Sequence, residues 1–191
     1  VISYSVASSQ DIRGAEMFIR NINGLKFECT LELYIDNSIN RYRPIVFLDW
    51  GAGGGYLAFT HELEVKPGIL KKKYVGYYTY PAAGLYNIVY KDTFRISNIN
   101  NINTSETEAI EVSYQHLINP LLGSNNSPIV FSYQTNVVNK NGIYHFVPNA
   151  WDPDHDSLSF KFVSCIATNY NFPNSIVIDS IERQVMLKLR Q

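Results

Sequence analysis

The fold class is decided by the stretch Lys26-Phe27-Glu28-Cys29-Thr30-Leu31-Glu32-Leu33-Tyr34-Ile35-Asp36, in which side chains alternate in character. Phe27, Cys29, Leu31, Leu33 and Ile35 fall on one face, and Glu28, Thr30, Glu32 and Tyr34 fall on the other. Successive side chains of a strand point to opposite faces, so the pattern predicts a half-buried antiparallel strand. Asn23-Gly24, just before it, is a hairpin signal. Residues 17–21 are therefore the expected partner strand.

The rest of the chain has the composition of an all-β protein. Its 191 residues are 46% hydrophobic and include 14 Tyr and 10 Phe, and no window of helical length shows a sustained 3.6-residue period. Further strands are expected at 44–48, 57–63, 74–80, 86–90, 109–114, 129–133, 143–147, 158–164, 175–178 and 184–189. Short strands separated by turns favour β-sandwiches over a βαβ fold.

A polar stretch with Gly and Pro at residues 120–128 predicts a domain boundary. We expect two tandem immunoglobulin-like or cadherin-like β-sandwich domains, residues 1–124 and 125–191. The second has about two strands fewer than an immunoglobulin-like sandwich, so it reads as truncated. A truncated sandwich keeps an open sheet edge, which favours self-association of the chain.

Charge and hydropathy exclude several classes of protein. Sixteen Lys and Arg against 17 Asp and Glu give a formal charge of −1, which argues against a nucleic-acid binder and, with the high apolar content, against a disordered chain. No apolar run approaches the roughly 18 residues of a membrane span, so no membrane insertion is expected. Cys29 and Cys165 occupy faces that argue against a disulfide, and both are expected to be free thiols.

Charge is most concentrated at Asp152, Asp154 and Asp156, at alternate positions of a loop. Clustered carboxylates repel one another or recruit a cation, and several hard oxygen ligands suit Ca²⁺. The loop is not an EF-hand, because Ser157 and Val163 stand where that motif needs Gly and Glu. The alternative is a solvated Asp-rich turn in which aspartates cap backbone amides and Pro153 fixes the bend.

Two parts of the chain resemble known families. The linker Asn125-Asn126-Ser127-Pro128 and the segment Ala150-Trp151-Asp152-Pro153-Asp154-His155-Asp156-Ser157-Leu158-Ser159-Phe160 resemble the N-x-P opening and A-x-D-x-D-G-D-x-L-x-Y signature of bacterial cadherin-like domains, with His155 in place of the usual Gly. The resemblance implies Ca²⁺ binding by the linker Asn126 together with Asp152, Asp154 and Asp156.

The first part is similar to the N-terminal region of gliding-motility-associated surface proteins of Bacteroidetes. The similarity lies in residues 27–36, in Tyr80-Pro81-Ala82-Ala83-Gly84-Leu85-Tyr86-Asn87-Ile88 and in Phe94-Arg95-Ile96-Ser97-Asn98-Ile99-Asn100-Asn101. Asn37 replaces a frequent Cys, and Ile96-Ser97 interrupts an R-N pair. Such proteins are exported by a type IX secretion system, so the resemblance implies an extracellular or outer-cell-surface location.

Three functions follow as hypotheses. The first is a non-enzymatic adhesion or spacer module, stabilised by calcium, whose partner is a cell-surface or extracellular protein or a polysaccharide. The second is a carbohydrate-binding or accessory module of a secreted polysaccharide-degrading enzyme, with Trp50, Tyr77 and Tyr78 as contact residues. The third, a hydrolase, is the weakest, since paired glycosidase carboxylates come from separate elements about 5–9.5 Å apart. No catalytic residue is therefore assigned.

Overall fold

The chain divides into two compact units in its computed structural model, which describes residues 11–39, 42–99, 102, 104–130, 143–146, 150–161, 163–164, 170, 176–179 and 184–188. One unit comprises Val1–Asn125 with Ile166–Tyr170, and the other comprises Asn126–Cys165 with Asn171–Gln191. That residues 1–124 and 125–191 fold as separate domains stays a prediction.

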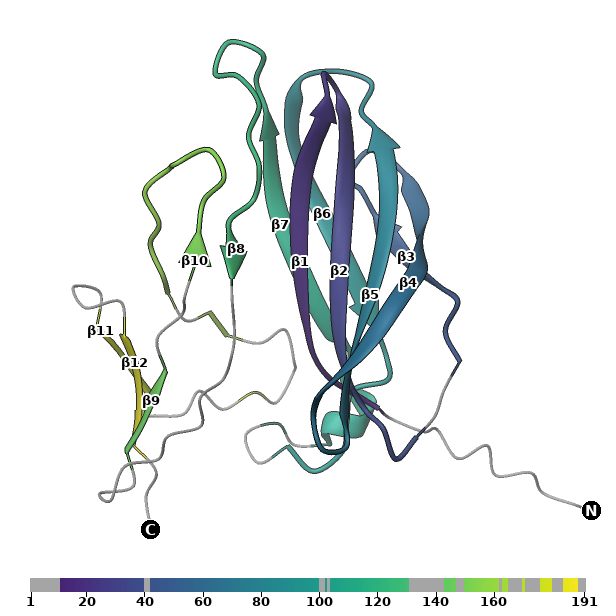
Figure 1. Ribbon diagram of the computed structural model, residues 1–191, viewed down its shortest axis with the longest axis vertical. Helices are drawn as coiled ribbons and strands as arrows, with labels where there is room; N and C mark the ends of the chain where they lie inside the picture. The colour runs from purple at the N-terminus through teal and green to yellow at the C-terminus, as the bar shows by residue number, and fades with distance from the viewer. Residues whose placement is uncertain are drawn as a thin grey trace, which may run out of the picture. The chain divides into compact units, whose positions relative to one another are not determined.

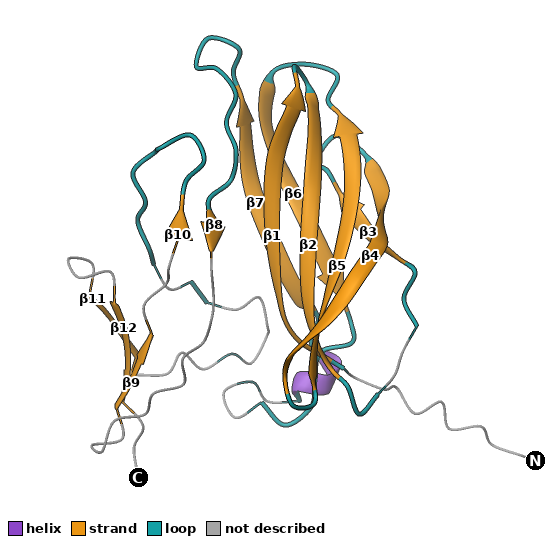
Figure 2. Ribbon diagram, in the orientation of Figure 1, coloured by secondary structure: helices purple, strands orange, loops and turns teal. Residues whose placement is uncertain are grey.

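The described residues of the first unit form a single antiparallel sheet of seven strands (Figures 1 and 2). The strands are β1 (Ile12–Asn23), β2 (Lys26–Asp36), β3 (Ile45–Asp49), β4 (Gly54–Lys66), β5 (Ile69–Thr79), β6 (Gly84–Asp92) and β7 (Ile110–Ile118). Their order in the sheet is β1-β2-β5-β4-β3-β6-β7. The edge strands β1 and β7 contact each other, so the sheet curls into a nearly closed barrel.

The prediction of two tandem β-sandwiches is wrong. All seven strands of the first unit belong to one hydrogen-bonded sheet, whereas a sandwich needs two facing sheets. The second unit is not a truncated sandwich either. Its described strands form a two-stranded sheet of β8 (Ile129–Val130) and β10 (Ala150–Trp151), and a three-stranded sheet in the order β11 (Ile176–Asp179), β12 (Gln184–Lys188) and β9 (Ile143–Phe146). No strand forms in the described part of 158–164.

The predicted hairpin is confirmed. β1 pairs with β2 in antiparallel register from Ile12↔Ile35 to Asn23↔Lys26, and Gly24 in the turn has φ 54°, a left-handed value that glycine adopts without strain. The other strands expected in the first unit are present as β3 to β7. A short 3₁₀ helix, η1 (Ser105–Thr107), precedes β7. Within the described residues, no helix is long and apolar enough to cross a membrane.

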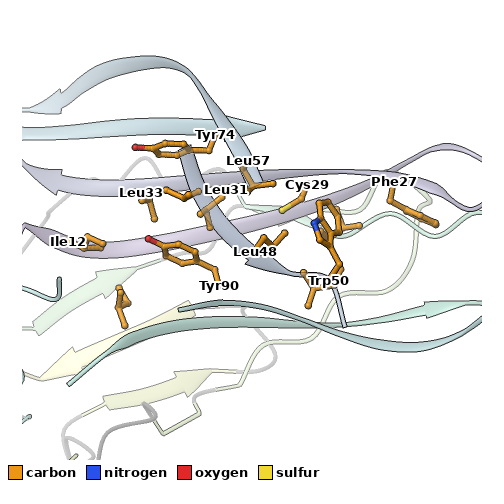
Figure 3. Close-up of a cluster of buried hydrophobic side chains, with 14 of the residues drawn as sticks. Ile12, Phe27, Cys29, Leu31, Leu33, Leu48, Trp50, Leu57, Tyr74 and Tyr90 are labelled. Atoms are coloured by element: carbon orange, nitrogen blue, oxygen red, sulfur yellow. The ribbon is translucent and has the colours of Figure 1, made fainter. Parts of the chain in front are cut away.

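The core fills the inside of the barrel (Figure 3). The five apolar residues of β2 predicted to share a face are all buried there. They pack with Leu48 of β3, Trp50 just after β3, Leu57 of β4, Tyr74 of β5 and Tyr90 of β6. Cys29 is a free thiol in this core, and burial raises its pKa. Cys165 lies outside the described residues.

A buried ion pair ties together three segments next to the start of β1. The two terminal guanidinium nitrogens of Arg43, Nη2 and Nη1, donate to the carboxylate of Asp11 at 2.8 Å and 3.2 Å, and the guanidinium lies over the Phe94 ring at 5.0 Å. The Asp11 N–H also donates to the Phe94 carbonyl, and the Asp11 carbonyl accepts from the Asp36 N–H. Asp11 therefore joins the end of β2, the segment before β3 and the segment after β6.

The barrel closes between β1 and β7. Every hydrogen-bonded pair of neighbouring strands is antiparallel, and an odd number of strands makes the first and last run in the same direction. The described strands show no ladder between β1 and β7. Partly buried side chains, among them Met17 of β1 and Tyr114 of β7, pack against the core beside this junction.

Candidate functional site

The aspartate loop follows β10 and is organised by hydrogen bonds to its own backbone. Asp152 is buried, and its Oδ1 accepts the N–H of Asp154 at 2.8 Å and that of Asp156 at 3.3 Å. The Asp152 carbonyl also accepts the N–H of His155, at 3.1 Å. This is the arrangement of an Asx turn, in which the aspartate side chain accepts the hydrogen bond of a backbone N–H that would otherwise go to a backbone carbonyl at the bend.

The linker residue Asn126 contacts the same loop. Its backbone N–H donates to Oδ2 of Asp154 at 2.6 Å, and its side-chain Nδ2 donates to Oδ1 of the same carboxylate at 2.8 Å. Both residues belong to the second unit. Three of the four predicted calcium ligands, Asn126, Asp152 and Asp154, are thus connected within one hydrogen-bonded network, and the fourth, Asp156, joins it through its backbone N–H.

The carboxylates of this loop do not converge on one point. Among the residues that the structure describes, no three His, Cys, Asp or Glu side chains are placed to hold a metal ion. The Asp156 side chain is exposed. The arrangement therefore fixes the loop to the linker through protein hydrogen bonds, and calcium binding at Asn126, Asp152, Asp154 and Asp156 stays a prediction.

His155 occupies the position at which cadherin-like sequences have glycine. Its φ is 64°, in the left-handed region that favours glycine, and its ring lies 6.3 Å from that of Trp151 in an edge-to-face arrangement. Histidine is one of the few other residues enriched in this region. The left-handed backbone conformation at residue 155 would therefore explain why cadherin-like sequences have glycine at this position.

A second candidate site is an exposed apolar surface on the outside of the barrel. It consists of Ile45 and Phe47 on β3, Tyr56 on β4 and Tyr77 on β5, which are between 51% and 66% exposed. We call these four residues the outer apolar face. Exposed apolar clusters of this kind mark interaction sites more often than isolated surface residues do.

Strand register brings the four residues together. Phe47 lies directly opposite Tyr56, and their rings are 5.6 Å apart in an edge-to-face arrangement. β4 and β5 pair at Ala58↔Val75, so the same register places Tyr56 opposite Tyr77. Gly54 lies under the Phe47 ring, where a Cβ would lie 2.4 Å from the ring Cζ and would displace the ring from its present position.

Charged groups border the outer apolar face at Tyr77. The Lys26 ammonium lies 5.5 Å from the centre of the Tyr77 ring. The Tyr77 hydroxyl hydrogen-bonds to Glu28, which raises the pKa of this phenol, and Glu28 accepts from Arg20 at 3.0 Å and 3.2 Å. These contacts place charged groups of both signs beside the Tyr77 ring. The result is an apolar centre with a mixed-charge border.

The aromatic residues proposed for carbohydrate contact are separated by the fold. Tyr77 is exposed as expected, but Trp50 is buried and stacks on Tyr78, with ring centres 5.4 Å apart and planes 14° apart. The expectation that Trp50 is exposed for ligand contact is therefore wrong. Phe47 and Ile45 were not predicted as site residues, because every residue from Ile45 to Leu48 is apolar and the run does not show which side chains face outward.

Comparison of the chain with protein-family models, with curated proteins and with solved structures finds no match. The similarities to bacterial cadherin-like domains and to gliding-motility-associated surface proteins therefore rest on the quoted motifs alone.

Proposed function

We propose that this chain is a non-enzymatic adhesion module of an extracellular or outer-cell-surface protein, and that its barrel binds a protein partner through the outer apolar face. The observation that carries the proposal is the exposure of four neighbouring apolar side chains on one side of β3, β4 and β5. None of the four is charged, and Lys26, Glu28 and Arg20 lie at the border.

This composition favours a protein partner over a polysaccharide. Protein interfaces combine an apolar, aromatic centre depleted of charge with a polar border. Aromatic anchors at such a centre contribute most of the binding free energy. The carbohydrate alternative loses Trp50, which is buried, and retains Tyr77 of its three named residues. Protein adhesion is therefore the function that the geometry supports best.

Removing two anchors of the outer apolar face is expected to abolish adhesion. Beads that carry the chain would be tested on surfaces coated with a second copy of the chain, with gelatin and with cellulose. Phe47→Ser combined with Tyr56→Ser should weaken attachment to protein by roughly 1,000-fold, since each hot-spot anchor contributes about 2 kcal/mol and the two together about 4 kcal/mol.

The matched control changes another outward pair. Asn87 and Gln115 lie opposite each other on β6 and β7 and are exposed, so Asn87→Ser with Gln115→Ser should leave attachment unchanged. Attachment to cellulose alone would favour the carbohydrate alternative. The proposal would be contradicted if the unmodified chain and both double variants attached equally well. It would also be contradicted if the unmodified chain attached to none of the three coatings.

Calcium stabilisation of the aspartate loop is the second part of the proposal. Asp154→Asn should lower the free energy of unfolding of the second unit by about 1.5–3 kcal/mol even in chelator, because an amide nitrogen would face the Asn126 donors. Calcium should in addition raise the melting temperature of the unmodified chain, more than magnesium does, and not that of the variant.

Differential scanning calorimetry in EDTA, in millimolar Ca²⁺ and in millimolar Mg²⁺ separates these two effects. The variant could melt lower than the unmodified chain by the same amount in all three buffers, while calcium leaves the melting temperature of the unmodified chain unchanged. Asp154 would then act through its hydrogen bonds alone. Identical melting of both proteins in EDTA would contradict the hydrogen-bond role.

A further inference from the structure

His116 is a fully buried histidine on the edge strand β7. Its side chain points into the barrel and is 0% exposed, and neither ring nitrogen has a hydrogen-bond partner among the residues that the structure describes. Buried polar groups are nearly always hydrogen-bonded, so a histidine ring with both nitrogens unpaired is unusual. Such a ring is tolerated only in its neutral form, because an imidazolium would place an uncompensated charge in the core.

The surroundings of the ring are aromatic. Phe27 of β2 lies 4.4 Å away edge-to-face, and the rings of Tyr80, which follows β5, and Tyr114, on β7 itself, lie at 6.0 Å and 5.8 Å. Tyr86 of β6 lies directly opposite His116 in the pairing of β6 with β7. Each contact is between rings, and none supplies an acceptor to the imidazole nitrogens.

The titratable groups facing His116 from these elements are the three tyrosines, with the Cys29 thiol of β2 close to Tyr80. Cys29 and Tyr80 are neutral when histidine titrates, since burial raises the pKa of both groups. No ion pair of His116 occurs among the described residues that contact it. Burial alone lowers the pKa of His116 from 6.5 to about 4.

β7 is also one of the two edge strands of the barrel sheet, which can detach with the loss of a single ladder. It is hydrogen-bonded to one neighbour, β6, in the described sheet, and on its other side it meets β1 without a ladder. Detaching it breaks one set of inter-strand bonds, whereas removing β2 would break two. Exposure of the His116 ring therefore requires movement of a single edge strand.

We propose that His116 makes the closure of the barrel acid-sensitive, because protonation of its buried ring releases β7 from β1 and from the core. This inference is independent of the proposed adhesion function. It assigns a conformational role to a side chain that lies on the opposite face of the sheet from outward-facing residues such as Gln115 and Leu117.

The direction of the pH effect follows from the two states of the ring. The closed barrel favours neutral histidine and the open state protonates near pH 6.5, so closure is most stable above pH 6.5. Stability is then lost as the pH falls from 6.5 toward 4. The difference between 6.5 and about 4 corresponds to a roughly 300-fold increase in the population of the open state.

Amide hydrogen exchange of the whole chain between pH 7.5 and 4, corrected for intrinsic exchange rates, tests the proposal. The β7 amides should lose protection by about 150-fold by pH 4 relative to those of β2, since the ring of the closed barrel is itself half protonated there. His116→Phe should remove this pH dependence, and His116→Leu provides a second non-titrating variant. His61→Gln, at an exposed position of β4, is the matched control and should behave as the unmodified chain.

Three results would overturn the proposal. The first is an unchanged pH dependence of β7 in both His116 variants. The second is equal loss of protection in β2 and β7, which would show global unfolding. The third is titration of the His116 ring near pH 6.5, followed by NMR, while β7 stays protected. A β7-specific loss that disappears in either folded variant supports it.

Discussion

Asp11→Ala is expected to lower the free energy of unfolding of the barrel by about 3–5 kcal/mol, because it leaves the Arg43 guanidinium buried without its counter-ion. Asp11 is 0% exposed and Arg43 is 8% exposed, so water cannot replace the lost carboxylate without a change in packing. A loss of this size is a large fraction of the 5–15 kcal/mol that stabilises a typical domain. Urea denaturation followed by circular dichroism measures it.

An ion pair of the same sheet with one largely exposed partner is the control for Asp11→Ala. Lys91 and Glu111 lie opposite each other on β6 and β7 with 3.6 Å between their charged atoms, and the Lys91 side chain is largely exposed. Lys91→Ala should cost less than about 1 kcal/mol, as exposed pairs do. Equal effects of the two substitutions would show that the Asp11–Arg43 pair is not buried in solution.

Trp50→Ala should destabilise the barrel by about 3–5 kcal/mol, since it removes one of the largest buried side chains of the core. The cavity would adjoin Tyr78, which stacks on the indole, and Tyr80, whose hydroxyl donates to the Trp50 carbonyl at 3.0 Å. Trp50→Phe, which retains a ring, should cost less. Urea denaturation followed by far-UV circular dichroism gives these differences without relying on tryptophan fluorescence.

Tyr56→Ala serves as the matched control for Trp50→Ala. Tyr56 is 66% exposed on the outside of the same sheet, and a substitution there should change stability by no more than about 0.5 kcal/mol. If Trp50→Ala were equally harmless, the indole would not be part of the core, and its role as a ligand contact would have to be reconsidered.

Local pattern was enough to predict the strands of the first unit but not how they assemble. The alternation in residues 26–36 fixes which side chains of β2 face inward, and Asn23-Gly24 fixes its pairing with β1. A sandwich and a barrel both bury one face of each strand, so alternation does not distinguish them. The deciding pairs are β2 with β5 and β3 with β6, which are distant in sequence and leave no local signal.

The candidate sites show the same division. The spacing of Asp152, Asp154 and Asp156 identified the loop, and Asn126 does contact Asp154. Whether carboxylates converge on a cation or cap backbone amides depends on the turn, which the spacing of the acidic residues does not specify. Phe47 was missed because it lies between buried Val46 and Leu48 in a run without polar residues.

The junction between β1 and β7 has a consequence for how the chain folds. The hairpins β1–β2, β3–β4, β4–β5 and β6–β7 connect strands adjacent in sequence and can form early, whereas β1 and β7 are the most distant strands of the sheet. Contacts of high sequence separation form slowly, so the barrel is expected to close last. Until then the newly made sheet has two bare edges, and pairing with the edge of another molecule competes with closure. Refolding yield should therefore fall as protein concentration rises, even though β1 and β7 contact each other in the finished barrel.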